Sequence, residues 1–153
     1  MSENTNNTRL NFQGTYEFLA DAGGRVQFPA KWRPAEEVTL SVMYWKDEGQ
    51  VHPSLLVLQR HTVQKMEDKL ESMSFSDPKA QSLRRLLGGD SDDLRLDPTG
   101  RIRLPERLAT KAKLGKGVVL VGMFDRFQIW SAELYKDIQA VDEVLRPEAV
   151  KLI

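Results

Sequence analysis

The sequence predicts an α+β fold, mainly β, in which two internal repeats pack as one small double-split β-barrel with flanking helices. Three observations support this prediction. A nine-residue motif occurs twice, short alternating strands surround each copy, and longer stretches carry a single apolar stripe at helical spacing. Neither half has enough strands to close a core alone, so we expect the halves to exchange hairpins about a pseudo-twofold axis.

The motif runs over Asp21–Pro29 and again over Asp97–Pro105, with equivalent residues 76 positions apart. Its Asp suits the first position of a β-turn, because the carboxylate can accept backbone N–H groups two residues on. The Gly can adopt the positive φ that closes the turn. Apolar and polar residues then alternate until a Pro ends the strand. The residues predicted to structure the turns are Asp21, Gly24, Asp97 and Gly100.

The first half is predicted to contain, in order, strand 12–18, the hairpin motif, helical turn 29–33, strand 38–44, polar loop 46–53, strand 55–58 and helix 62–73. The strands alternate in polarity, and Gly14 suggests a bulge in the earliest one. Pro34 stops the helical turn. The helix carries Val63, Met66 and Leu70 on one stripe.

The second half is predicted to repeat this order after an extra helix, with strand 92–96, the second motif, helix 106–111, strands 118–123 and 127–130, and a last helix from residue 132. Ser76 or Asp77 caps the extra helix, and Gly88 lies just past its end. Ser131 caps the last helix, and Pro147 ends it. Its buried stripe is predicted to be Leu134, Ile138, Val141 and Leu145.

The composition is that of a globular protein, with 41% apolar and 29% charged residues. There are 22 basic and 22 acidic side chains, so the chain is not a generic polyanion binder, although a local basic face stays open. The absence of cysteine excludes disulfides and thiolate metal sites. We expect no signal peptide and no membrane partner, because the apolar run 118–124 is too short to span a bilayer. These features predict a soluble, cytoplasmic protein.

Catalytic chemistry has little support. There is no Cys and no Gly-x-Ser-x-Gly elbow, and the two histidines, His52 and His61, have no ligand cluster around them. Gly115-Lys116-Gly117 lacks the length and the Ser or Thr of a phosphate-binding loop. We therefore expect no enzyme activity, no metal site and no cofactor. A metabolic enzyme on a small barrel would need a pocket with perturbed titratable groups.

Nucleic acid is the better candidate partner. Arg101 and Arg103 lie on the same side of a strand, roughly 7 Å apart. With Arg25 and Gln27 they offer donors for phosphates or for base edges in the major groove. Arg33 and Arg107 follow the motifs and could add phosphate contacts. The candidate DNA-binding residues are Arg25, Gln27, Lys31, Arg101 and Arg103. Ordinary surface cations explain the same residues equally well.

These motifs resemble a known family. The stretches 12–16, 21–31, 96–105 and 118–130 are similar to MraZ, a family of bacterial transcriptional regulators in the larger SpoVT/AbrB swapped-hairpin group. The resemblance implies a swapped-hairpin barrel of AbrB type and a homo-oligomeric ring, an octamer or similar. It also implies binding to double-stranded DNA at promoter-proximal direct repeats of the division and cell-wall gene cluster, and association with the nucleoid. The family's DNA-contacting arginines map onto Arg25 and Arg101.

The resemblance also divides the chain. It implies a first AbrB-like repeat over 11–75 and a second over 91–147. The polar stretch 1–10 is itself expected to be a disordered tail, and residues 76–90 a connecting helix. The chain departs from the family pattern at Gly23 and Thr99, where a Lys or similar polar residue is usual. An alternative is an antitoxin-like or other protein-binding member of the same fold group. Such chains usually carry one motif and a disordered tail, whereas this chain has two motifs.

Overall fold

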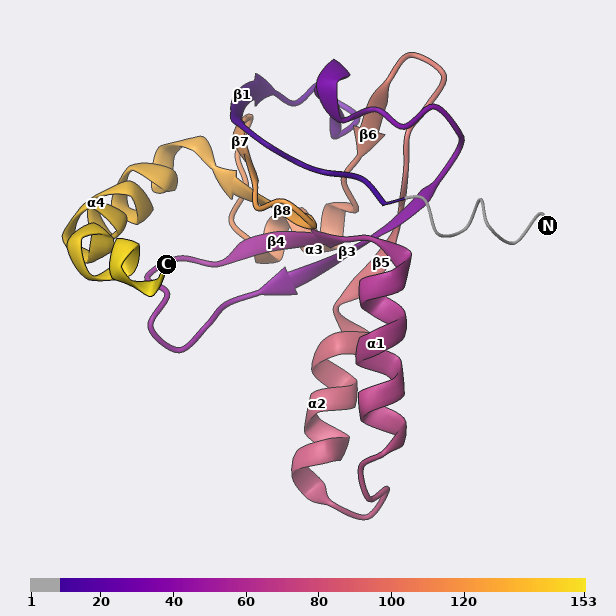
Figure 1. Cartoon of the computed structure of the whole chain (residues 1–153). Helices are drawn as coiled ribbons and strands as arrows, with labels where there is room; N and C mark the ends of the chain where they lie inside the picture. Colours follow the sequence, from indigo (N-terminus) through magenta and orange to yellow (C-terminus); the bar gives the residue numbers. More distant parts are fainter. Residues whose placement is uncertain (1–8) are drawn as a thin grey trace.

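The computed structural model describes residues 9–153, which fold around one antiparallel sheet flanked by helices (Figure 1). The elements are β1 Thr15–Leu19, β2 Arg25–Gln27, η2 Ala30–Trp32, β3 Thr39–Trp45, β4 Ser54–Leu58, α1 Arg60–Glu71, α2 Pro78–Gly89, β5 Ser91–Arg95, β6 Arg101–Arg103, α3 Glu106–Lys111, β7 Gly117–Gly122, β8 Arg126–Ser131, α4 Ala132–Ala149 and η3 Val150–Leu152. The predicted α+β class is confirmed. The tail predicted over residues 1–10 lies outside the described residues except for Arg9 and Leu10.

The two halves of the chain interlock through strand pairing. The six-stranded sheet has the order β1-β7-β8-β4-β3-β5, and β2 and β6 form a separate two-stranded antiparallel ribbon. Each first-half strand pairs with a second-half strand, namely β1 with β7, β2 with β6, β3 with β5 and β4 with β8. If each strand of the first half is exchanged for its counterpart in the second half, β1 for β5 through β4 for β8, the same set of strand pairs results. Within residues 9–153 the sheet stays open, with β1 and β5 as its edges.

The main core lies between the ribbon and the sheet. Val26 and Ile102 of the ribbon are fully buried, together with sheet residues such as Val42 and Leu120. Four aromatic rings meet there, and every pair of them has centroids 4.9–6.4 Å apart. These rings belong to Phe12, Phe28, Trp32 and Phe127. Burying a side chain of this size stabilises the fold by about 1.5–3 kcal/mol, so the ribbon is held firmly on the sheet.

A second apolar cluster lies on the other face of the sheet. Met43, Leu56 and Leu58 are buried there under Met66 and Leu87, which belong to α1 and α2. The two helices form a hairpin that projects from the sheet (Figure 1). The predicted cap of α2 is confirmed, because the Asp77 side chain accepts the Lys79 backbone N–H at 2.9 Å. Of the helices described, none is long and apolar enough to cross a membrane.

Some predicted boundaries are wrong. The first strand begins at Thr15 rather than at residue 12, because Gly14 takes φ +107° and interrupts the extended chain. Phe12 forms only an isolated bridge with Phe124. Helix α2 continues through Gly89 instead of ending before Gly88. A Gly in a last turn costs only about 1 kcal/mol, which does not force a helix to stop.

Two predictions for α4 are wrong as well. The helix runs past Pro147 to Ala149, so the missing N–H of this proline does not end it. The predicted stripe is only half covered, since Val141 is 42% and Leu145 is 55% exposed. The predicted Ser131 cap is confirmed, with its Oγ accepting the Leu134 N–H at 3.3 Å.

Candidate nucleic-acid interface

The two copies of the motif fold into the same turn. Asp21 Oδ1 accepts the backbone N–H groups of Gly23 and Arg25 at 2.9 and 2.8 Å. Asp97 Oδ1 accepts the equivalent N–H groups of the second copy, both at 2.9 Å. This is the local side-chain-to-backbone bonding for which Asp is favoured in turns. Each carboxylate therefore binds the backbone of its own turn.

Each turn also closes onto the opposite half of the chain. Gly24 and Gly100 take φ +79° and +81°, which L side chains rarely adopt. The Gly24 carbonyl accepts the Leu104 N–H at 2.9 Å, and the Gly100 carbonyl accepts the Phe28 N–H at 3.1 Å. The left-handed glycines thus turn their carbonyl groups toward the partner strand and fix the register of the ribbon.

The ribbon turns its apolar side inward and its polar side outward. Val26 lies opposite Ile102 in the register, and both side chains are fully buried. Because side chains alternate along a strand, the flanking residues point away from the core. The pairs on that outward side are Arg25 with Arg103 and Gln27 with Arg101. Four of the five predicted DNA-binding residues therefore share one face, whereas Lys31 is exposed on η2.

One carboxylate joins the arginines of the two copies. Asp21 Oδ2 lies 3.5 Å from Arg25 Nη1 and 3.3 Å from Arg101 Nη1. Arg101 also donates from Nε to Thr99 Oγ1 at 3.0 Å and lies 3.5 Å from an Asp97 carboxylate oxygen. The Arg25 and Arg101 side chains keep 38% and 36% exposure. Each guanidinium has five N–H donors, so both retain donors for a ligand.

The carboxylates of the two turns are stabilised in their charged form. The backbone hydrogen bond from Arg25 is the largest cause that lowers the pKa of Asp21. The corresponding bond from Arg101 lowers the pKa of Asp97, with help from the Thr99 side chain. Both groups are ionised at neutral pH, and their charge-assisted bonds orient the adjacent arginines.

The other two cations considered from the sequence are bound within the chain. Arg33 donates to the carbonyl oxygens of Phe28 and Gly100, at 3.3 and 3.4 Å. Arg107 donates to Asp90 at 3.0 Å and to the Gly89 carbonyl at 3.1 Å. The sequence pattern alone could not separate these two cations from the arginines that lie on the outward face of the ribbon.

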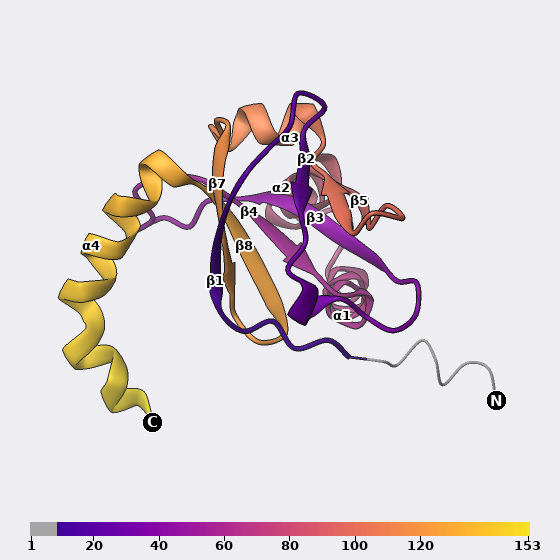
Figure 2. The ribbon, with the colours of Figure 1, turned by 90° about the horizontal axis from the view of Figure 1, so that it is seen from above.

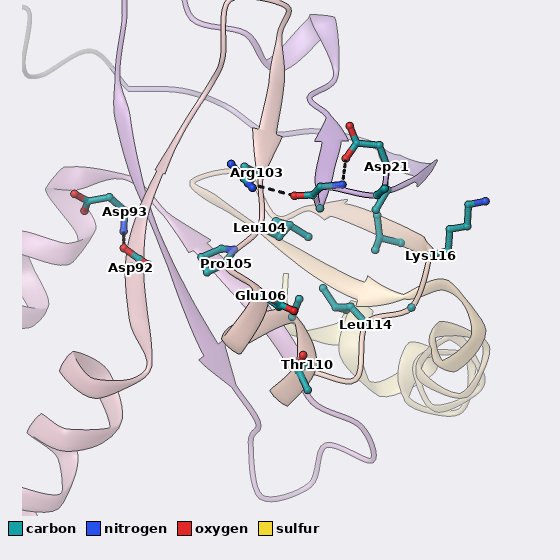
Figure 3. Close-up of a pocket in the computed structure, with 17 residues that line it drawn as sticks. Asp21, Asp92, Asp93, Arg103, Leu104, Pro105, Glu106, Thr110, Leu114 and Lys116 are labelled. Atoms are coloured by element: carbon teal, nitrogen blue, oxygen red, sulfur yellow. Dashed lines mark hydrogen bonds between the residues drawn. The ribbon is translucent and has the colours of Figure 1, made fainter.

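A hollow of about 820 Å³ opens beside the first motif turn (Figure 3). Arg103 lies at its rim and donates to the Gly23 carbonyl at 3.2 Å. The charged residues of its lining are Asp21, Asp92, Asp93, Arg103, Glu106 and Lys116. Four carboxylates and two cations disfavour a polyanion in this hollow.

The sequence did not predict the acidic lining of the hollow or the contact of Asp21 with the arginines of both motif copies. Asp92 and Asp93 lie in β5, as the predicted strand 92–96 requires, but nothing in the sequence indicated that they line a hollow. The contact of Asp21 with Arg101 spans 80 positions and leaves no local signal. The repeat of Asp, Gly, Arg and Pro at one spacing was the clue in the sequence that the two copies are related in the fold. Among residues 9–153, no group of three or more His, Asp or Glu side chains is arranged to hold a metal ion.

The fold and the ribbon together define an α+β protein whose two halves build one ribbon with arginines on its outward side. A protein of Alkalilimnicola ehrlichii named transcriptional regulator MraZ is 34% identical over 131 residues, which cover 82% of this chain and 83% of that protein. The chain belongs to the MraZ family of transcriptional regulators.

Further comparisons agree. The family model described as "MraZ protein, putative antitoxin-like" matches residues 88–149, which comprise most of the second half. A Pseudomonas putida protein of the same name is 31% identical over 131 residues, covering 86% of this chain and 87% of its own length. One from Shewanella frigidimarina is 32% identical over 125 residues, covering 82% of each chain.

Proposed function

We propose that this chain is a sequence-specific DNA-binding transcriptional regulator that acts on promoter-proximal direct repeats of the division and cell-wall gene cluster. The observation that carries the proposal is the pair of guanidinium groups of Arg25 and Arg101, held side by side by Asp21 on an exposed ribbon. The regulator name of the relatives supports it.

The ribbon suits the major groove of DNA. A two-stranded antiparallel ribbon fits that groove as a helix does. Arg25 and Arg101 would donate to phosphates or to the O6 and N7 atoms of guanine, and the Gln27 amide would read adenine. Arg103 would contact a phosphate at the edge of the ribbon, and Lys31 would do so from η2.

We further propose that ribbon and sheet together correspond to a swapped-hairpin barrel with two AbrB-like repeats, residues 11–75 and 91–147, joined by a connecting helix at 76–90. The crossed pairing of the strands supports this division, because each half completes the other. The shared core between ribbon and sheet supports the barrel, since it contains residues from both.

We propose that the protein acts as a ring-shaped homo-oligomer bound to the nucleoid in the cytoplasm. Several subunits on successive direct repeats would raise the effective concentration of each weak contact without a new contact type. The small ribbon of a single chain favours this arrangement, because it offers few base-reading side chains.

Gel-shift titration with the chain's own upstream DNA tests the proposal. The double variant Arg25→Ala, Arg101→Ala should weaken specific binding at least tenfold, since one good bidentate contact is worth about 1–3 kcal/mol. The variant Lys65→Ala, Lys69→Ala removes the same charge from exposed positions of α1 and serves as the control. Equal binding by the wild type and the arginine variant would exclude the ribbon as the reading element.

A second candidate is a protein-binding, antitoxin-like role, which the description of the matching family model favours. In that case a small partner protein would purify with the chain, and the arginine variant would retain it. If the arginine variant loses DNA binding and no partner protein purifies with the chain, the result supports the regulator instead.

A further inference from the structure

Helix α4 leaves its second half uncovered. Val141, Val144 and Leu145 are 42%, 79% and 55% exposed, and no residue of α4 is buried. The three side chains lie at i, i+3 and i+4, so they share one face of the helix. A contiguous apolar patch of this kind on a soluble chain marks a protein contact site.

The other half of the molecule shows how such a face is covered. Helix α1 follows β4 just as α4 follows β8, and it is succeeded by α2. Leu87 of α2 packs in the same cluster as Met66 of α1, and Arg84 of α2 donates to the Leu70 carbonyl at 3.0 Å. Within the described chain, α4 is followed only by the short η3. Within residues 9–153, no second helix covers the exposed face of α4 in the way that α2 covers α1.

The charges of α2 and α4 are opposite. Helix α2 carries three basic residues and no acidic one, whereas α4 carries five acidic and two basic residues, a net charge of −3. Leu86 is 57% exposed on the outer side of α2, and Lys79, Ser82 and Arg85 are exposed beside it. An apolar residue flanked by cations on α2 complements an apolar patch flanked by carboxylates on α4.

The two helices cannot meet within one chain. Figure 1 shows α4 at one side of the sheet and the α1–α2 hairpin projecting from another, and Figure 2 shows the same separation from above. The complementary surfaces therefore have to belong to different molecules.

We propose that the outer face of α2 in one copy of this chain docks on the second half of α4 in another copy. Leu86 packs against Val144 and Leu145, and Arg85 faces Asp142. The contact is heterologous, because each copy offers two different surfaces, and heterologous contacts generate rings when the rotation closes. The inference rests on the homo-oligomer of the proposed function and leaves the ribbon free for DNA.

Charge reversal tests the contact. Arg85→Asp and Asp142→Arg should each weaken assembly at least tenfold, as measured by sedimentation over a range of concentrations. The double variant should restore most of the wild-type mass, because every interface then has the reversed pair. Lys65→Asp makes the same charge change as Arg85→Asp on the neighbouring helix and should leave the mass unchanged. Circular dichroism checks that each variant retains its helices.

The outcomes separate this inference from DNA recognition. The Arg25→Ala, Arg101→Ala variant should assemble like the wild type, whatever happens to its DNA binding. A wild type that is monomeric at all concentrations would overturn the interface, as would single reversals of unchanged mass or a double variant that stays dissociated. Weaker DNA binding by Arg85→Asp at unchanged mass would assign α2 to DNA and would also overturn it.

Discussion

Arg101 donates from Nη1 to Asp21 Oδ2 over 3.3 Å, across 80 positions of the sequence. The equivalent contact of Arg25 with Asp97 is not among the ion pairs of the described chain. Arg101 is therefore restrained by Thr99, Asp97 and Asp21, whereas Arg25 contacts Asp21 alone. The ribbon is symmetric in its backbone pairing and asymmetric in its ion pairs, and the contacts of Asp21 make the difference.

Asp21→Asn should tighten non-specific DNA binding about fivefold. The amide can still accept the turn N–H groups, but it no longer places a negative charge between two arginines. The removal of this charge strengthens the attraction of the two arginines for phosphate groups. Asp97→Asn is the matched control, because Asp97 contacts the Arg of its own turn only. Fluorescence anisotropy with random-sequence DNA measures both, and a larger gain for Asp97→Asn would contradict the bridging role of Asp21.

Arg103→Ala should reduce the slope of log K against log salt concentration by about 1, because it removes one phosphate contact. Gln27→Ala should leave that slope unchanged, since an uncharged amide releases no counterion. It should instead reduce discrimination between the direct repeat and a mutated repeat. Binding titrations at several salt concentrations check the pair. The assignment of Arg103 to a phosphate is wrong if the slopes of the two variants coincide.

Gly100→Ala should destabilise the fold more than Gly24→Ala does. Both residues have positive φ, and a Cβ there costs about 1–2 kcal/mol. At Gly100 the Cβ would overlap the Arg33 guanidinium, whereas at Gly24 it would meet only the Leu104 carbonyl at 3.4 Å. Displacing Arg33 loses its bonds to two backbone carbonyls, about 1 kcal/mol each. Urea unfolding compares the two variants, and equal losses would contradict the packing of Arg33.

Gln59→Met should cost about 3 kcal/mol of stability. The Gln59 side chain is 4% exposed and bonds both backbone groups of Leu10, at 2.7 and 2.9 Å, and the Asp125 carbonyl at 2.8 Å. Methionine has a similar volume but leaves these buried groups without a partner, at about 1–3 kcal/mol each. Gln64→Met, at an exposed position of α1, should change stability by less than about 0.5 kcal/mol. Chemical denaturation measures the stability of both variants, and equal losses would contradict the stabilising role of the Gln59 hydrogen bonds.

The turn carboxylates should make stability depend on acid pH. The pKa of Asp97 is below its ordinary value of 3.8 in the folded chain, so the fold favours the ionised form. Its contribution is complete above about pH 4 and is lost as the pH falls through the lowered folded pKa. Asp97→Asn should therefore flatten the stability curve below pH 4 and leave its shape above pH 5 unchanged. Thermal melts between pH 2.5 and 7 measure this, and an unaltered acid slope would count against the role of Asp97.

Local chemistry predicted the parts of the fold that depend on nearby residues. The Asp21 and Asp97 turns, the positive φ of Gly24 and the caps at Asp77 and Ser131 all follow from contacts within a few positions. The shared Asp, Gly, Arg and Pro of the two motif copies predicted that the halves of the chain pack against each other, but not that the copies pair directly as one ribbon.

The errors came from features that sequence spacing does not contain. A helical stripe shows that one face of α4 is apolar, but it cannot show that nothing in the chain covers Val141 and Leu145. Gly88 and Pro147 are helix breakers in an interior and are tolerated in a last turn. Arg33 and Arg107 looked like free cations because their acceptors are distant carbonyls and a carboxylate on another element.

The crossed pairing of the strands has a consequence for synthesis of the chain on the ribosome. Each of the strands β1–β4 pairs with a strand from β5–β8. No strand of the first half therefore has all its pairing partners until the second half has emerged. Such long-range pairing folds slowly and leaves strand edges open meanwhile. Nascent chains stalled before β7 should therefore be protease-sensitive, and release of the full length should make them resistant in one cooperative step.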